Sequence, residues 1–281
     1  MFPVLFHFGH FAIPTYGVFT AAALLAALAV SVQVAQWLGL RNDKIWNLGL
    51  IAILATLFGA RLLLVATNFQ AFRAEPFWLL GLANIPGVWA PLGGVAVGGV
   101  GALLYALAEG LPLRRTADVL APAAALGFAI NRIGAFCGGE GWGTRTRLPW
   151  GVIYRNVEAY LWYQTPMRVK LQPVQLYDAA LSLVLFGVLL AMIRRRPRAG
   201  ALAGTWLFVY GVGRFFLEFL RGDTAGERLL GGAVTFGQAL AFVAVVAGGM
   251  LWMVGEQATG NRQQGIGRKP DRGSAGAETP S

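Results

Sequence analysis

The sequence predicts an all-α membrane protein with about seven transmembrane helices. Of its 281 residues, 56% are hydrophobic and 13% are charged, a balance typical of polytopic membrane proteins. Apolar stretches of about 20 residues, the length that a helix needs to cross the hydrocarbon, recur along the chain. The net charge of +10 does not require a nucleic-acid partner, because the basic residues gather beside the apolar stretches.

The expected spans follow one another with short connections, except between the fourth and the fifth. The fourth span contains Pro122 and Asn131, which membrane helices tolerate where neighbouring helices satisfy the backbone. The seven spans lie near residues 17–38, 46–67, 88–108, 117–137, 174–193, 201–221 and 235–254.

Basic residues predict the orientation of the chain. They cluster after the first, third and fifth spans and in the tail, and these four segments fall on the same side of the membrane. The positive-inside rule makes that side cytoplasmic. We therefore expect the N-terminus outside and the C-terminus in the cytoplasm. The residues are Arg41, Lys44, Arg114, Arg115, Arg194, Arg195, Arg196, Arg198, Arg262, Arg268, Lys269 and Arg272.

The same pattern divides the chain into four regions. Residues 1–137 would hold an N-terminal periplasmic segment and transmembrane helices 1–4, and residues 173–254 would hold helices 5–7. Residues 138–172, rich in Trp and Tyr, are expected to form a small external head at the membrane interface. Residues 255–281 have few large apolar side chains and are expected to form a disordered cytoplasmic tail.

Four arginines lie inside the expected spans: Arg61, Arg132, Arg214 and Arg221. A cation at the bilayer centre costs about 2.5–3.5 kcal/mol on insertion scales, so each is a candidate functional residue. The guanidinium keeps its proton and presents a fork of donors that fits phosphate oxygens. Together they predict a pocket for an anion delivered from within the membrane, and the abundant anion there is a lipid phosphate.

Two motifs carry most of these cations. In residues 131–143, Arg132, Glu140 and several glycines coincide near the outer end of the fourth span. The alternative is that Arg132 reaches the interface by snorkelling and Glu140 is only a loop ion-pair partner. In residues 210–221, Arg214, Glu218 and Arg221 are spaced to share one helix face.

The second motif has its own alternative, a self-neutralising stripe of ion pairs. One glutamate cannot neutralise two arginines, so an anion or another carboxylate must complete the face. Asp178, at the start of the fifth span, is a candidate partner for one arginine.

Several weaker features remain open. Tyr16 could line a site or anchor the first span at the interface. Arg61 could contact a ligand or bond to a neighbouring helix. Gly93 and Gly94 favour close helix packing over a phosphate loop, since no Lys-Ser/Thr follows them. With Cys137 the one cysteine and only two histidines in the chain, we expect no metal and no cofactor.

Taken in order, these motifs resemble the bacterial prolipoprotein diacylglyceryl transferase family, from Ile13 through to the last span. The resemblance rests on Tyr16-Gly17, on Gly59-Ala60-Arg61 where the family has Gly-Gly-Arg, on the signature at 131–143, on 173–178 and on 210–221. The chain also departs from the family at five further positions. Leu92 replaces a His proposed as the base that takes the thiol proton, Asn131 replaces Gly, Ala135 and Gly138 replace Asn, and Cys137 stands at a usually aliphatic position.

The resemblance implies transfer of a diacylglyceryl group from phosphatidylglycerol to the lipobox cysteine of a prolipoprotein, with release of glycerol phosphate. It implies a multi-pass protein of the bacterial cytoplasmic (inner) membrane whose partners are phosphatidylglycerol, the prolipoprotein signal peptide and membrane lipids, with no nucleic acid. The alternative is a catalytically degenerate phospholipid-binding protein or a transporter on the same fold. The expected catalytic residues are Arg132, Arg214 and Glu140, and the expected substrate-binding residues are Tyr16, Arg61, Gly93, Gly94, Tyr210, Glu218 and Arg221.

Overall fold

A computed structural model describes residues 2–8, 11–74, 89–223, 228–229 and 232–267. The described chain is mostly helical, and five of its helices are long and apolar enough to cross a membrane. These are α1 (Thr15–Leu38), α2 (Asn42–Thr67), α5 (Leu113–Gly138), α7 (Val174–Ile193) and the Phe236–Met253 part of α9 (Phe236–Gly267). The expectation of a helical membrane protein is confirmed at this level.

The two other expected spans also form helices. α4 (Trp89–Ala108) has an apolar part, Leu92–Ala108, that is shorter than the other five. α8 (Ala201–Glu218) contains Arg214 and ends at Glu218. The helix therefore stops before Arg221, which the sequence placed on the same span. At the C-terminus, α9 continues to Gly267, beyond the expected start of the tail at residue 255, because the Glu, Gln and Arg there are good helix formers. Residues 268–281 lie outside the described residues.

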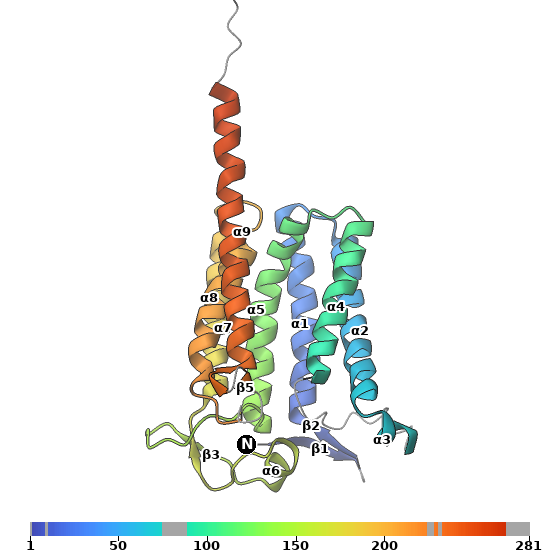
Figure 1. Cartoon of the computed structure of the whole chain (residues 1–281), viewed down its shortest axis with the longest axis vertical. Coiled ribbons are helices and arrows are strands. Elements are labelled where there is room, and N and C mark those ends of the chain that lie inside the picture. Colours follow the sequence, from blue (N-terminus) through green and yellow to red (C-terminus); the bar gives the residue numbers. More distant parts are fainter. Residues whose placement is uncertain (1, 9–10, 75–88, 224–227, 230–231, 268–281) are drawn as a thin grey trace, which may run out of the picture.

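The long helices pack in a row (Figure 1). α4 packs on α2, α2 on α1, α1 on α5, α5 on α7 and α8, and α8 on α9. Small residues make the α2–α4 contact possible. A Cβ added at Gly93 would lie 2.7 Å from Leu63 Cβ, and one added at Gly94 would lie 2.8 Å from the carbonyl oxygen of Thr56. This close approach is the small-residue packing that the glycines of this segment favour.

Short elements gather at one end of the bundle (Figure 1). They are the hairpin of β1 (Val4–Phe8) and β2 (Phe11–Pro14), the hairpin of β3 (Val152–Ile153) and β4 (Lys170–Leu171), α3 (Phe69–Ala74) and α6 (Val157–Tyr163). A third hairpin pairs β5 (Arg228–Leu229) with β6 (Val234–Thr235) just before α9. Residues 142–171 enclose a small apolar cluster around Tyr154, Ala159 and Leu171.

The largest apolar core lies at the other end of the helices. Ile45, Leu48, Val119, Leu189 and Leu202 are almost fully buried there. The carboxylate of Asp118 is buried in the same region. It accepts hydrogen bonds from the backbone N–H groups at the start of α8: Gly200 (2.7 Å), Leu202 (2.9 Å) and Ala203 (3.0 Å). Asp118 thereby satisfies donors that a helix N-terminus leaves without intrahelical partners.

Candidate functional site

The site begins where α5 ends. Gly139 and Gly141 have φ angles of 96° and 67°, in the left-handed region that side chains other than glycine rarely adopt. They turn the chain back over the end of α5. The turn brings Gly141 against Arg132, since a Cβ at Gly141 would lie 4.0 Å from an Nη atom of that arginine. Two glycines of the 131–143 motif, Gly139 and Gly141, are therefore needed for a sharp turn.

The turn is then joined to the end of α8. The N–H of Thr144 donates to the carbonyl of Leu220 (2.7 Å), and the N–H of Gly222 donates to the carbonyl of Trp142 (2.9 Å). Gly222 permits this approach, because a Cβ there would lie 2.3 Å from the Trp142 ring. These bonds fix the two arginine motifs, which lie about eighty residues apart in sequence, to each other.

Arg132 from α5, Arg214 from α8 and Arg221 just after α8 line one small cavity. The prediction that the arginines gather in one place holds for these three. The other lining residues are Gly141, Val174, Gln175 and Asp178.

Asp178, on α7, joins the two motifs through an ion pair. Its Oδ2 lies 2.8 Å from Nε of Arg132 and 3.9 Å from Nε of Arg214. Its side chain is only 4% exposed, so these charges interact with little screening by water. Asp178 is thus the additional carboxylate that the second motif requires.

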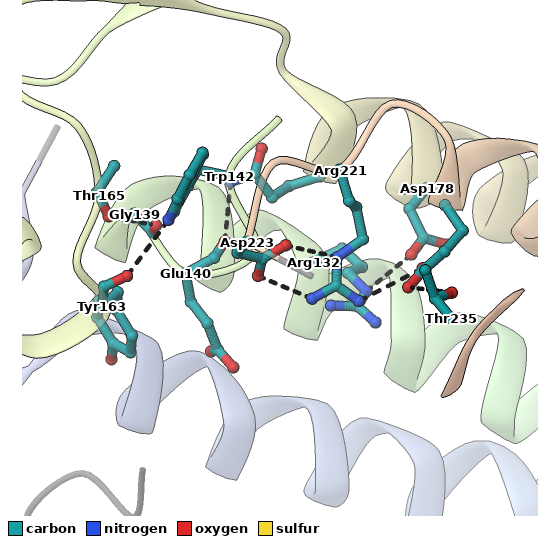
Figure 2. Close-up of polar contacts among 12 residues, drawn as sticks. Arg132, Gly139, Glu140, Trp142, Tyr163, Thr165, Asp178, Arg221, Asp223 and Thr235 are labelled. Atoms are coloured by element: carbon teal, nitrogen blue, oxygen red, sulfur yellow. Dashed lines mark hydrogen bonds and ion pairs between the residues drawn. The ribbon is translucent and has the colours of Figure 1, made fainter. Parts of the chain in front are cut away.

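Glu218 and Asp223 complete the ion pairs. Oε2 of the fully buried Glu218 lies 2.7 Å from Nη1 of Arg214 and 3.5 Å from Nη1 of Arg221. Asp223 binds Arg221 with both oxygens, at 2.8 Å to Nε and 2.7 Å to Nη2 (Figure 2). The sequence analysis did not identify Asp223, although its position two residues after Arg221 is a local signal for such a pair.

The N-terminus of α9 holds Glu218 in place. Thr235 Oγ1 donates to Glu218 Oε1 (3.2 Å) and accepts from the N–H of Gln238 (3.1 Å), while Gln238 Oε1 accepts from the N–H of Thr235 (3.0 Å). This reciprocal pattern is a capping box. A Cβ at Gly237 would lie 2.4 Å from Glu218 Oε1, so the carboxylate rests directly on this glycine. The sequence Thr-Phe-Gly-Gln could have revealed the cap.

These contacts balance the formal charges at the cavity. Three guanidinium groups face the carboxylates of Asp178, Glu218 and Asp223. Hydrogen bonding at the cavity is nevertheless incomplete, because Oδ1 of Asp178 and Oε1 of Gln175 are buried without a hydrogen-bond partner in the described structure. Buried polar atoms without partners are rare in native proteins and point to unmet contacts with a ligand or water.

Glu140 occupies a separate place beside the arginines. It lies next to Tyr16 of α1 and points toward that helix (Figure 2). No ion pair with Glu140 occurs among the described residues, and the carboxylate that pairs with Arg132 there is Asp178. The catalytic role expected of Glu140 stays a prediction. Burial raises the pKa of the Glu140 carboxyl, and the charge of Arg132 offsets part of the rise.

The two tyrosines predicted for the site are close enough to Arg132 to interact with its charge, but neither is among the residues that line the cavity of the described structure. The Tyr16 ring meets Tyr163 edge to face, with centroids 6.3 Å apart. The Tyr210 ring, near Asp178, belongs to a cluster with Phe128 (centroids 5.3 Å apart) and Trp206 (5.8 Å).

The remaining predicted residues lie elsewhere. Arg61 is on α2, and the lining of the cavity found in the described chain does not include it. Gly93 and Gly94 lie in the α2–α4 contact, on the far side of α1 from α7 and α8 (Figure 1). Their role in substrate binding stays a prediction. Among the described residues, no group of three His, Cys, Asp or Glu is placed to hold a metal ion.

Comparison with known proteins agrees with this geometry. A family model described as "Prolipoprotein diacylglyceryl transferase" matches residues 3–254. The chain belongs to this family. The match includes every residue of the cavity, so the family assignment and the arginine cluster concern the same part of the molecule.

Individual relatives cover most of the chain. A phosphatidylglycerol–prolipoprotein diacylglyceryl transferase of Clostridium tetani is 29% identical over 227 residues, which is 81% of this chain and 88% of the relative. The protein of that name from Parasynechococcus marenigrum is 32% identical over 270 residues, 89% of this chain and 92% of the relative. The one from Geobacter sulfurreducens is 31% identical over 252 residues, 85% and 90%.

Proposed function

We propose that this member of the prolipoprotein diacylglyceryl transferase family moves a diacylglyceryl group from phosphatidylglycerol to the thiol of a lipobox cysteine, releasing glycerol phosphate. The observation that carries the proposal is the convergence of Arg132, Arg214 and Arg221 on one cavity within a helical membrane protein. Anions that reach such a place from the bilayer are lipid phosphates. The printed names of the relatives specify the same donor and acceptor.

The arginines would act on the leaving phosphate. As the carbon–oxygen bond breaks, negative charge grows on phosphate oxygens, and guanidinium groups already in place stabilise it. Arg132 has the donors for this task, because its ion pair with Asp178, the one that Arg132 makes among the described residues, is through Nε. Arg214 likewise pairs with Glu218 through Nη1 alone. Asp178 and Glu218 would orient these two guanidinium groups so that their remaining N–H donors face the cavity.

Tyr16, Tyr210, Glu218 and Arg221 would shape the pocket for the lipid headgroup. Arg221 lies on the cavity wall but is already bound by Asp223 through two nitrogens. We therefore assign it a supporting role and give Arg132 and Arg214 the phosphate. Arg61, Gly93 and Gly94 are assigned to the path of the acyl chains or the peptide, because they lie on α2 and α4 away from the cavity.

The proposed topology places all seven long helices across the bacterial inner membrane. The short hairpins, α6 and the arginine cavity lie at one end of the bundle, and the basic turns near Arg41, Arg114 and Arg195 lie at the other (Figure 1). The positive-inside rule then puts residues 138–172 and the N-terminus in the periplasm and the C-terminus in the cytoplasm. A periplasmic opening suits an acceptor cysteine that leaves the cytoplasm in an exported precursor.

The test is transfer by the purified full chain in vesicles that contain phosphatidylglycerol, with a peptide bearing a lipobox cysteine. Glycerol phosphate and thioether-linked peptide are measured together. Arg132→Ala and Arg214→Ala are each expected to lower kcat/KM by about 10²–10³-fold, the usual effect of losing one group that stabilises developing charge. Arg115→Ala is the matched control, since Arg115 bonds to the carbonyl of Pro197 away from the cavity.

Two outcomes would reject the proposal. Headgroup binding without release of glycerol phosphate would identify a degenerate lipid-binding protein. Full activity of Arg214→Ala would show that the cluster does not act on the phosphate. Lys at position 214 is a further probe, because an ammonium group keeps the charge but cannot form the planar fork.

A further inference from the structure

The proposed reaction needs a group that takes the thiol proton, and the chain has Leu92 where a His was expected. His10 lies outside the described residues, and the described lining of the cavity contains no histidine. Among the described residues in and beside the cavity, four carboxylates are candidates: Asp178, Glu218, Asp223 and Glu140.

Three of the four carboxylates already form ion pairs with arginines. Asp178 lies between Arg132 and Arg214, and Glu218 lies between Arg214 and Arg221. Asp223 holds Arg221 with both of its oxygens. Protonation of any of these groups would remove the charge that holds a guanidinium in position, and would so weaken the binding of the phosphate at the moment it leaves.

Glu140 differs from the other three. It has no ion pair in the described chain, and its Oε2 is shielded from solvent without a hydrogen-bond partner. Arg132 and Arg221 are near enough for their charges to act on it, so it lies beside the phosphate site without being part of its ion pairs. A buried oxygen with an unused lone pair is suited to accept a proton from an incoming donor.

Neighbouring residues fix the position of Glu140. Its backbone carbonyl accepts from Nε2 of Gln175 (2.8 Å), which fixes the loop after α5 to the start of α7. On the α1 side, Tyr16 lies beside the carboxylate, and Asn131 Nδ2 donates to Thr20 Oγ1 (2.9 Å) one turn away on that helix. The backbone of Glu140 is thus fixed to α7, and its carboxylate lies beside Tyr16 of α1.

We propose that Glu140 is the general base that accepts the proton of the substrate thiol. The inference rests on the proposed function. In the step, the S–H bond breaks and its proton passes to the Glu140 carboxylate. The sulfur electron pair forms a bond to the diacylglyceryl carbon that carries the phosphate ester. The carbon–oxygen bond breaks, its electron pair leaves on glycerol phosphate, and Glu140 later returns the proton to water.

The raised pKa of Glu140 is consistent with this role. A carboxyl whose pKa lies above its usual range is a stronger base once ionised, and general bases act best when their pKa approaches the working pH. The direction of the pH effect follows: only the ionised carboxylate accepts a proton, so kcat/KM falls as the pH drops through the pKa of Glu140.

Glu140→Gln tests the proposal with two nucleophiles. The peptides are a lipobox peptide and the same peptide with selenocysteine, whose selenol is more acidic than a thiol and needs no base. With the thiol we expect kcat to fall by about 10²–10³-fold, within the range for loss of a general base. With the selenol the fall should stay below about tenfold. Glu158→Gln, which alters a carboxylate on α6 outside the cavity, is the matched control.

The outcomes separate the base from other roles. An equal loss with both nucleophiles would show that Glu140 organises the site, and would overturn the proposal. So would an unchanged acidic limb in the pH profile of Glu140→Gln. If the unaltered protein releases no glycerol phosphate with either peptide, the proposed function fails instead, whatever Glu140 does.

Discussion

Buried carboxylates lie at both ends of α8, and they are held in opposite ways. At the start of the helix, Asp118 is 0% exposed and accepts three backbone hydrogen bonds. At the other end, the carboxylates are held by arginine side chains, and Asp178, Gln175 and Glu140 each keep a buried oxygen with no partner. Both oxygens of Asp118 have hydrogen-bond partners within the protein. The arrangement at the other end leaves polar contacts unmet.

This difference in bonding indicates a structural role for one end of α8 and a functional role for the other. A buried polar group that is fully bonded rigidifies the fold, whereas one that is partly bonded costs stability. Proteins retain such a cost where binding or catalysis uses the unmet contacts. The Asp118 end therefore fixes where α8 begins, and the arginine end is held ready for a ligand. Each prediction below tests this contrast.

The largest effect is expected for Asp178→Asn. The substitution keeps the shape of the side chain but removes the charge shared by Arg132 and Arg214. We expect kcat/KM to fall by about 10²-fold or more, as for the loss of a group that preorganises charge at a reacting centre. Thermal unfolding in detergent should change much less than activity. Retained activity would mean that Asp178 does not orient the arginines.

Asp118→Ala should show the reverse pattern. It removes three hydrogen bonds between a charged acceptor and a helix N-terminus, at an estimated cost of about 2–4 kcal/mol in stability. We expect a lower yield of folded protein and a lower unfolding temperature. The activity of each folded molecule should remain within about twofold, because Asp118, on α5, contacts the start of α8, whereas Arg214 lies near the end of that helix. Loss of kcat without loss of stability would contradict the purely structural role given to Asp118.

The sequence predicted the helices and much of the arginine site, because both depend on local patterns. Apolar stretches of spanning length predicted the helices, and the cost of a buried guanidinium singled out Arg132 and Arg214. The pairing of Arg132 with Asp178 could not be deduced, since it depends on how α5 and α7 pack. Arg61 was grouped with the others by the same reasoning, but its helix packs on the other side of α1.

The sequence also could not tell which carboxylates are free. Sequence analysis left open whether Glu140 is a catalytic residue or a loop ion-pair partner. The turn made by Gly139 and Gly141 sends Glu140 toward α1 instead. The contact between the α9 cap and Glu218 could not be predicted for a different reason: Thr235 lies next to Glu218 only because the β5–β6 hairpin brings the chain back.

Thr235→Val is expected to have an intermediate effect. It removes the hydroxyl that caps α9 and bonds to Glu218, while the shape of the side chain is nearly kept. The lost cap should cost about 1 kcal/mol in stability. Because Glu218 positions Arg214, we also expect kcat/KM to fall by about tenfold with KM nearly unchanged. Thr235→Ser keeps the hydroxyl and should restore kcat.

The cap prediction fails if Thr235→Val and Thr235→Ser lose activity equally, since the hydroxyl would then be irrelevant. Gly237→Ala gives an independent check. A Cβ there must displace the Glu218 carboxylate, which lies 2.4 Å from the position it would take. It should therefore lower kcat in the same way as Thr235→Val and leave the α9 cap itself intact.

The smallest effect is expected for Lys44→Ala, which removes an ion pair on the Asp118 side of the molecule. Lys44 Nζ lies 3.1 Å from Glu109 Oε2 and 2.7 Å from the Glu109 carbonyl oxygen, but the Glu109 side chain is 42% exposed. Water and salt screen such a pair, so its removal should cost at most about 0.5 kcal/mol and leave activity unchanged. A cost equal to that of Asp118→Ala, measured by unfolding in the same detergent, would show that an exposed ion pair stabilises this end as much as a fully bonded buried carboxylate does, and would contradict the structural role given to Asp118.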